Sequence, residues 1–343
     1  MPDAVTSPRE RRLFGTDGVR GRAGEFLSAD LALSLGRAAA VASGAATPQV
    51  LIVRDTRESG EMLEAALAAG IAAGGGDALL GGVLPTPGAA LLVRRYGFDM
   101  AAVVSASHNP FEDNGIKFFG SDGMKLADDL EDAIDAGIAR APALEAAPLI
   151  VGSADGLGEA AVLGEAIEEL TDGDERYLAF LLEGVPSLEG LRIIVDCANG
   201  AASNLAPEAY RDAGASVNVL HADPDGRNIN DRSGSTHPEH LIAAVTATGA
   251  HLGIAHDGDA DRMLAVDAHG DLVDGDQILG VLALEAHARG ALPKDTVVTT
   301  VMANIGFRRA MADAGISLVE TAVGDRYVPV SYTHLTLPTN REV

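Results

Sequence analysis

Residues 101–120 read AAVVSASHNPFEDNGIKFFG and decide the fold. The apolar run from Met100 to Val104 predicts a buried strand, because it is short and rich in branched residues. A tight loop around Pro110 follows, and residues 116–119 predict a second strand. Parallel α/β sheets place their ligand sites beyond the ends of their strands. The serines that follow Val104 are therefore well placed for chemistry.

Ser107 is the candidate nucleophile or phosphate carrier of this stretch. His108 is its neighbour and Lys117 follows ten residues later, so a phosphate on the Ser107 hydroxyl would find donors nearby. The alternative is an ordinary turn rich in Ser and Asn. The stretch taken alone leaves both interpretations open.

Helices and strands alternate on both sides of this stretch. Before it, the spacing predicts a helix over 31–42 capped by Ser28, a strand over 49–55, a helix over 59–73, a strand over 78–83 and a helix over 86–96. After it, we expect a helix over 128–140, then a linker and the start of a connecting helix over 141–173. A second α/β unit over 191–255 follows, and a third begins with a helix over 276–288 and a strand over 296–301. This alternation predicts parallel sheets with right-handed crossovers.

A second motif, DGDADR, occupies residues 257–262. Asp257, Asp259 and Asp261 share one side if the segment is extended, and without a cation their charges would repel. Ligands that are all oxygen favour Mg²⁺ or Ca²⁺. An EF-hand loop is excluded, because its sixth position would be Arg262 and its twelfth Ala268 instead of Gly and Glu. A solvated acidic turn is the remaining alternative.

Composition narrows the function classes. A length of 343 residues predicts two or three domains, and the net charge of −25 argues against a nucleic-acid partner. Cys197 is the single cysteine, so no intrachain disulfide can form. No apolar run approaches the ~20 residues of a membrane span, and the start lacks the apolar core of a signal peptide. We expect a soluble cytoplasmic protein without a membrane partner.

The glycine-rich segment FGTDGVRG at 14–21 surrounds Arg20. Its backbone N–H groups and the guanidinium could bind an oxyanion, although a structural turn would have the same composition.

Six motifs together resemble the α-D-phosphohexomutase superfamily, and within it most closely the bacterial phosphoglucosamine mutases. They are FGTDGVRG at 14–21, SASHNPFEDNGIKFF at 105–119, VDCANGA at 195–201, DGDADR at 257–262, VDGDQI at 273–278 and VGDRYV at 323–328. They follow the order of the family, and the resemblance covers the chain from about residue 12 to 328.

The resemblance implies tandem α/β domains with mixed or parallel sheets around a cleft. It implies that Ser107 is a phosphoserine and that Mg²⁺ is bound by Ser107, Asp257, Asp259 and Asp261. The remaining implied roles are phosphate binding and proton transfer. Arg20, Arg262, Asp325 and Arg326 are implied for phosphate or substrate, and His108 and Lys117 for the proton.

The implied reaction interconverts glucosamine 6-phosphate and glucosamine 1-phosphate through a sugar bisphosphate, in the supply of UDP-N-acetylglucosamine for the cell wall. Phosphomannomutase or phosphoglucomutase activity is the near alternative. A non-catalytic metal- or phosphosugar-binding protein is another, and a metal-dependent phosphatase is less favoured. The oligomeric state is left open.

Two departures from the family pattern carry expectations. Ala260 replaces the middle glycine of the usual DGDGDR, and because alanine is small we expect little effect. The later sugar- and phosphate-binding motifs of the family do not occur in this chain. We therefore expect a first domain over 1–165, a second with the metal loop over 166–272, a partial third over 273–328, no fourth, and a non-family tail over 329–343. A chain of this extent is expected to have little or no mutase activity.

Overall fold

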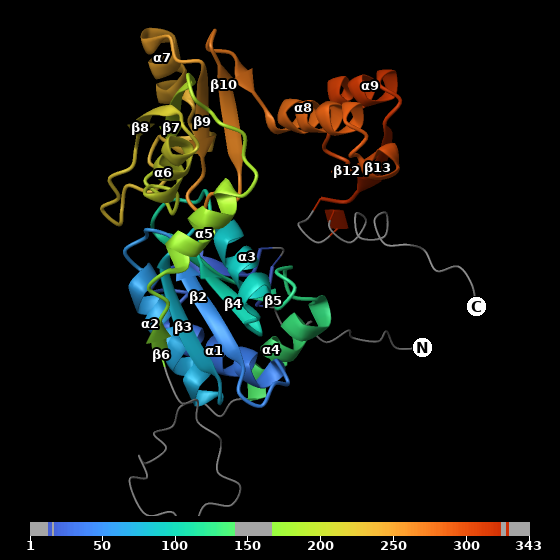
Figure 1. Cartoon of the computed structure of the whole chain (residues 1–343). Helices are drawn as coiled ribbons and strands as arrows, with labels where there is room; N and C mark the ends of the chain where they lie inside the picture. The colour runs from blue at the N-terminus through green and yellow to red at the C-terminus, as the bar shows by residue number, and fades with distance from the viewer. Residues whose placement is uncertain (1–12, 16, 141–166, 324–326, 329–343) are drawn as a thin grey trace, which may run out of the picture. The chain divides into compact units, whose positions relative to one another are not determined.

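The computed structural model describes residues 13–15, 17–140, 167–323 and 327–328, and the chain divides into two compact units (Figure 1). The first unit contains the chain up to Phe180 together with Pro224–Ile229. The second contains Leu181–Asp223 and the chain from Asn230 onward.

The first unit is built on a six-stranded sheet of order β1-β5-β4-β2-β3-β6. Its elements in chain order are β1 (Val19–Arg22), α1 (Ala29–Ala42), β2 (Gln49–Arg54), α2 (Gly60–Ala73), β3 (Asp77–Val83), α3 (Thr86–Tyr96), β4 (Met100–Val104), β5 (Asp113–Gly120), α4 (Asp128–Arg140), β6 (Ile167–Glu169) and the start of α5 (Gly173–Leu182).

The sheet is mixed, in agreement with the expected mixed or parallel sheets. β4, β2, β3 and β6 are parallel neighbours, whereas β5 pairs antiparallel with both β4 and β1. The connection from β4 to β5 contains no helix that could serve as a crossover, so the chain turns back on itself. Residues 167–169, expected to lie in a linker, form strand β6.

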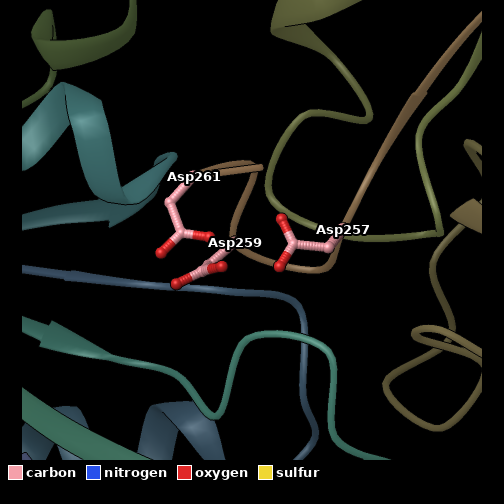
Figure 2. Close-up of side chains that lie close together, drawn as sticks. All are labelled: Asp257, Asp259 and Asp261. Atoms are coloured by element: carbon pink, nitrogen blue, oxygen red, sulfur yellow. The ribbon is translucent and has the colours of Figure 1, made fainter. Parts of the chain in front are cut away.

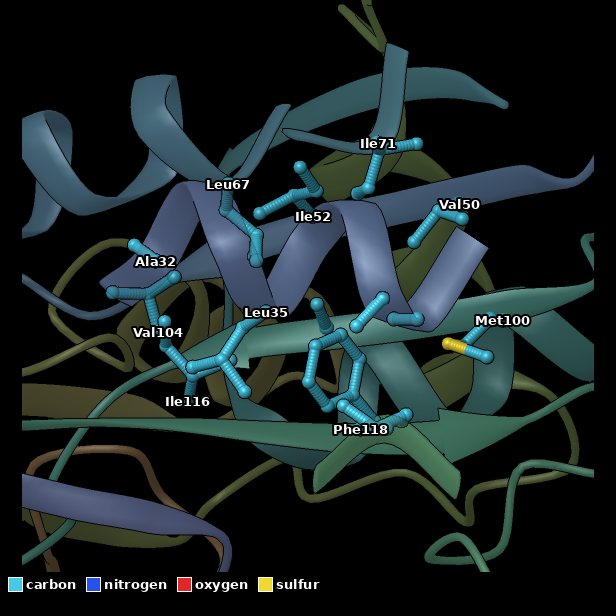
Figure 3. Close-up of a cluster of buried hydrophobic side chains, with 14 of the residues drawn as sticks. Ala32, Leu35, Val50, Ile52, Leu67, Ile71, Met100, Val104, Ile116 and Phe118 are labelled. Carbon is cyan, nitrogen blue, oxygen red and sulfur yellow. The ribbon is translucent and has the colours of Figure 1, made fainter. Parts of the chain in front are cut away.

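One face of this sheet packs against α1 and α2 (Figure 3). Ile52 of β2, Val104 of β4 and Ile116 of β5 contribute to the same buried cluster as Leu35 of α1 and Leu67 of α2. Since side chains alternate along a strand, the residues between these positions belong to the opposite face. The register Val19↔Ile116 and Val103↔Lys117 therefore assigns residues 20, 103, 115 and 117 to that opposite face.

The second unit contains a five-stranded sheet of order β11-β10-β9-β7-β8. Its elements are β7 (Arg192–Asp196), α6 (Leu205–Asp212), β8 (Ser216–Leu220), a 3₁₀ turn η1 (Gly234–Thr236), α7 (Glu239–Thr248), β9 (Leu252–His256), β10 (Met263–Asp267) and β11 (Leu272–Val273). β7 is parallel to β8 and β9, and β10 pairs antiparallel with β9 and β11. Leu241 and Val245 of α7 pack with Ile194, whereas Tyr210 of α6 packs with Ile193, so the two helices cover opposite faces.

The chain continues with α8 (Gly275–Ala288), a 3₁₀ turn η2 (Pro293–Asp295), β12 (Thr296–Thr300), α9 (Ile305–Asp313) and β13 (Ser317–Thr321). β12 and β13 are parallel, and a separate cluster around Phe307 and Met311 forms their core. The helix and strand expected at 276–288 and 296–301 are therefore present. Tandem α/β units with mixed and parallel sheets are confirmed.

Candidate functional site

Ser107 lies just beyond the carboxyl end of β4, where the sequence predicted it. Only 1% of the residue is exposed, and its φ is 54°. A residue other than glycine in this left-handed region is held there against a local energetic cost. The surrounding structure must therefore fix the backbone of Ser107.

A buried hydrogen-bond network surrounds this backbone. The Ser107 N–H donates to Ser105 Oγ at 2.9 Å, and Ser105 Oγ donates to Asp55 Oδ2 at 2.6 Å. Asp55 Oδ2 also accepts from Arg57 Nε at 2.9 Å. Arg57 Nη2 in turn donates to the carbonyl of Ser107 at 2.9 Å. Both peptide groups of Ser107 thus belong to a network made by Asp55, Arg57 and Ser105.

The sequence interpretation missed Asp55 and Arg57. Both follow β2, which is the parallel neighbour of β4 in the sheet. The carboxyl ends of adjacent parallel strands meet at the same edge, so the segment Asp55-Thr56-Arg57 carried a usable signal.

Arg20 and Lys117 lie on β1 and β5, on the face of the sheet opposite the α1/α2 core. Arg20 is paired in register with Gly115, whose carbonyl accepts from the N–H of Ser105 at 2.9 Å. Arg20 Nε has no hydrogen-bond partner among the described residues, and its guanidinium lies 3.7 Å from Asp17. Lys117 is buried, with 6% exposed, whereas His108 is exposed. The end of the glycine-rich segment 14–21 is strand, because β1 begins at Val19.

The three aspartates form a cluster in the second unit (Figure 2). One carboxylate oxygen from each of Asp257, Asp259 and Asp261 lies within 4.8 Å of the others. Asp257 and Asp259 are buried, and Asp261 is exposed. The segment is a turn between β9 and β10 with Ala260 at a φ of 54°, and not the extended segment that the alternation argument assumed. The carboxylates converge because the chain reverses direction.

The segment VDCANGA at 195–201 supports this turn through its backbone. The N–H of Ala201 donates to the carbonyl of Gly258 at 2.8 Å. A Cβ on Gly200 would overlap that same carbonyl, so the close approach requires glycine. The motif thus has a backbone role in holding the aspartate turn.

Arg262 is paired with the aspartates. Its Nη2 lies 3.0 Å from Asp257 Oδ2, and its Nε lies 3.4 Å from Asp261 Oδ1. Burial acts to lower the pKa of Arg262, but the charges of Asp257 and Asp261 outweigh it and raise the pKa. Asp325 and Arg326, the other implied phosphate-binding residues, lie outside the described residues.

The donor set fits a hard divalent cation. Carboxylate oxygens are the preferred ligands of Mg²⁺ and Ca²⁺, and three of them concentrate negative charge that one guanidinium only partly offsets. The aspartate turn can therefore bind a metal.

No helix in the described parts of the chain is both long and apolar enough to cross a membrane.

Comparisons with known proteins agree with this geometry. Models of phosphoglucomutase/phosphomannomutase α/β/α domains I, II and III match residues 11–144, 175–270 and 274–331. A phosphoglucosamine mutase from Corynebacterium diphtheriae is 53% identical over 324 residues, covering 92% of this chain and 70% of the relative. One from Mycolicibacterium paratuberculosis is 53% identical over 322 residues, covering 92% and 69%.

Solved structures show the same fold. A phosphoglucomutase/phosphomannomutase family protein from Burkholderia thailandensis has a TM-score of 0.80 at 27% identity, with 95% of this chain and 69% of that chain covered. The identities to the curated relatives, together with the matched domains and the Ser107 and aspartate motifs, assign the family. The chain belongs to the phosphoglucosamine mutases of the α-D-phosphohexomutase superfamily.

Proposed function

We propose that this chain interconverts glucosamine 6-phosphate and glucosamine 1-phosphate through a phosphate carried on Ser107. Membership of the family makes it a phosphosugar mutase. The observation that carries the choice of sugar is the 53% identity to relatives named phosphoglucosamine mutase. We propose that the reaction takes place in the cytoplasm, because the family's role in precursor supply implies that location.

The proposed cycle moves one phosphoryl group in each direction. The P–O bond to Ser107 Oγ breaks while a P–O bond to a sugar hydroxyl oxygen forms, and the hydroxyl proton passes to a base. The sugar bisphosphate then reorients and returns its other phosphoryl group to Ser107 Oγ. We propose His108 and Lys117 for the proton transfers, because one is an exposed imidazole and the other is an ammonium on the β5 strand. Arg20 and Arg262 are proposed to bind phosphate oxygens, together with Asp325 and Arg326.

We propose Mg²⁺ as the metal of the aspartate turn, held by Asp257, Asp259 and Asp261. The resemblance adds the phosphate on Ser107 as a further ligand. When bound, Mg²⁺ would neutralise the negative charge that develops during phosphoryl transfer. The protein residues supply the oxygen donors and the fixed turn that holds them.

Phosphopeptide mapping tests the nucleophile. The protein is incubated with glucosamine 1,6-bisphosphate and Mg²⁺, digested and analysed by mass spectrometry. We expect one phosphate on Ser107 and none in Ser107→Ala. Phosphate on Ser105 alone, with Ser107 unmodified, would contradict the assignment.

Asp259→Asn tests the metal site. Replacing a buried carboxylate by an amide should weaken Mg²⁺ binding and raise the transfer barrier by about 1–3 kcal/mol, because a charged partner is lost. Calorimetric titration measures the affinity without requiring turnover. Asp212→Asn is the control, since it makes the same charge change on an exposed residue of α6. Equal Mg²⁺ affinity in Asp259→Asn and the parent would place the metal elsewhere.

A comparison of sugar phosphates tests the proposed substrate preference. Turnover of glucosamine, glucose and mannose phosphates in parallel distinguishes phosphoglucosamine mutase from phosphoglucomutase and phosphomannomutase activity. Binding of the sugar phosphates without turnover would favour a non-catalytic binding protein. We propose that the first domain ends at residue 165, the second at residue 272 and the partial third at residue 328.

A further inference from the structure

We propose that Arg57 is a positioning residue that holds the Ser107 loop, here residues 105–113, in the conformation required for phosphoryl transfer. The inference rests on the proposed phosphorylation of Ser107. It assigns a role to a side chain outside the six family motifs quoted above.

The guanidinium of Arg57 uses all of its N–H groups. An arginine has five such donors in a planar fork. Arg57 Nε donates to Asp55 Oδ2 at 2.9 Å. The four N–H groups of Nη1 and Nη2 donate to backbone carbonyls of the loop, namely those of Ser107 (2.9 Å), Asn109 (2.8 Å), Pro110 and Asp113 (3.0 Å).

The site of Arg57 is built for this cation. Only 1% of Arg57 is exposed, and its ion-pair partner Asp55 is fully buried. Burial raises the pKa of Asp55, while the charge of Arg57 and the hydrogen bond from Ser105 act to lower it. Four of the five donors of this buried arginine point at one loop, so the planar fork is matched to the shape of that loop, and lysine could not reproduce it.

The network acts on Ser107 from both sides. The carbonyl of Ser107 accepts from Arg57, and its N–H donates to Ser105 Oγ, which is itself bonded to Asp55. These contacts fix the two peptide groups that set the φ of 54° at Ser107. Without them, the left-handed conformation would lose the contacts that offset its cost.

Phosphoryl transfer makes this fixation functionally important. The attacking and leaving oxygens must be nearly in line, so catalysis depends on position more than on covalent chemistry. Displacing a reacting atom by about 1 Å can slow a reaction by roughly 10²-fold. Ser107 Oγ is one of those atoms in each direction of the proposed cycle.

Arg57→Lys is the decisive variant, and Arg54→Lys is its matched control. Arg54 is also a largely buried arginine near the end of β2, but its ion pairs are with Glu61 and Glu64 and not with the loop. Hydrogen–deuterium exchange of peptides covering 105–113 is measured on the full chain, together with the melting temperature. Arg57→Lys should accelerate exchange there by roughly tenfold or more, because several hydrogen bonds open together, and Arg54→Lys should not.

The rate of Ser107 phosphorylation by glucosamine 1,6-bisphosphate is the second measurement. We expect Arg57→Lys to slow the transfer step by roughly 10²-fold at saturating bisphosphate, with the half-saturating concentration changed much less. Unchanged exchange and unchanged transfer in Arg57→Lys would overturn the proposal.

If Arg57→Lys does not fold, Ser105→Ala is the variant to measure, because it removes the acceptor of the Ser107 N–H. We expect Ser105→Ala to accelerate exchange at residues 106–108. Exchange there at the rate of the parent would overturn the proposal. If the parent is never phosphorylated on Ser107, the proposed function fails, while the exchange comparison still determines whether Arg57 fixes the loop.

Discussion

Ala260 occupies the left-handed region between two candidate metal ligands, at a φ of 54°. The expectation of little effect from replacing the family's glycine considered side-chain size alone, whereas the backbone conformation carries a cost. We expect Ala260→Gly to raise the free energy of unfolding by about 0.5–1 kcal/mol, the relief of left-handed strain less the added entropy of the unfolded chain. Urea denaturation in EDTA measures it.

Ala247→Gly is the opposite control for this prediction. Ala247 is exposed on α7, where the backbone is right-handed, so glycine should destabilise the protein by up to about 1 kcal/mol. The same sign of effect at both positions would show that the φ of Ala260 is not strained.

Cys197 is fully buried beside the sheet of the second unit. Burial, and secondarily the charge of Asp196, raises the pKa of its thiol from 9.0 to about 12. At pH 8 the thiolate fraction is then on the order of 10⁻⁴, so iodoacetamide should modify the native protein negligibly and the guanidinium-unfolded protein rapidly. Because the folded pKa is raised, this thiol also lowers native stability as the pH increases from 9 toward 12. Rapid modification of the native protein at pH 8 would contradict the burial.

Helices α1 and α2 approach each other through glycine. A Cβ on Gly36 of α1 would overlap the carbonyl of Leu67, and a Cβ on Gly70 of α2 would overlap the carbonyl of Leu33. Gly36→Ala should therefore lower the free energy of unfolding by about 1–3 kcal/mol, despite the better helix propensity of alanine, because the helices must separate. The denaturation midpoint measures the change.

Gly280 is the control for Gly36, because it is a helical glycine with room for a Cβ atom. A Cβ there would make an ordinary contact of 3.7 Å with Phe307, so Gly280→Ala in α8 should stabilise by up to about 1 kcal/mol. If Gly36→Ala also stabilises the protein, the packing of α1 on α2 does not require glycine at position 36.

Local signals predicted many of the elements, whereas pairing between distant residues escaped prediction. α3 has the predicted bounds Thr86–Tyr96, because Pro lies in its first turn and Gly97 caps it at a φ of 76°. The sequence analysis predicted no strand at β1, since its glycine-rich sequence becomes a strand only by pairing with β5, nearly a hundred residues later. The closeness of the three aspartates was predicted, but through an extended geometry. The observed turn depends on the backbone of Gly200 and Ala201, which no local pattern reveals.

At the scale of the molecule, neither compact unit is built from one continuous stretch of the chain. Residues 224–229 interrupt the second unit and belong to the first, where the N–H of Glu58 donates to the carbonyl of Gly226 at 2.9 Å. Composition divides a chain only into consecutive segments, so it cannot assign a short segment such as 224–229 to a unit distant in sequence. The six-stranded sheet and the five-stranded sheet have separate buried clusters, in agreement with the two or three domains expected from the length.

The net charge of −25 predicts how stability responds to ions. The chain has 50 acidic and 25 basic side chains, so repulsion among the excess negative charges dominates. The screening length falls from about 30 Å at 0.01 M to about 8 Å at 0.15 M salt, which weakens this repulsion. Raising NaCl over this range should increase the melting temperature by roughly 2–6 °C. A fall in the melting temperature would show that attractive ion pairs outweigh the repulsion.

Mg²⁺ should add a second increment that screening alone cannot produce. At constant ionic strength, an ion that binds only the folded chain stabilises it by about 2.7 kcal/mol at one hundred times its dissociation constant. We therefore expect the parent to melt higher when MgCl₂ replaces NaCl, and Asp259→Asn to lose that difference while keeping its response to NaCl. The variant removes one of fifty acidic side chains, so screening is almost unaffected. If both proteins gain equally from Mg²⁺, the ion acts on the diffuse charge of the surface and the aspartate turn is not its site.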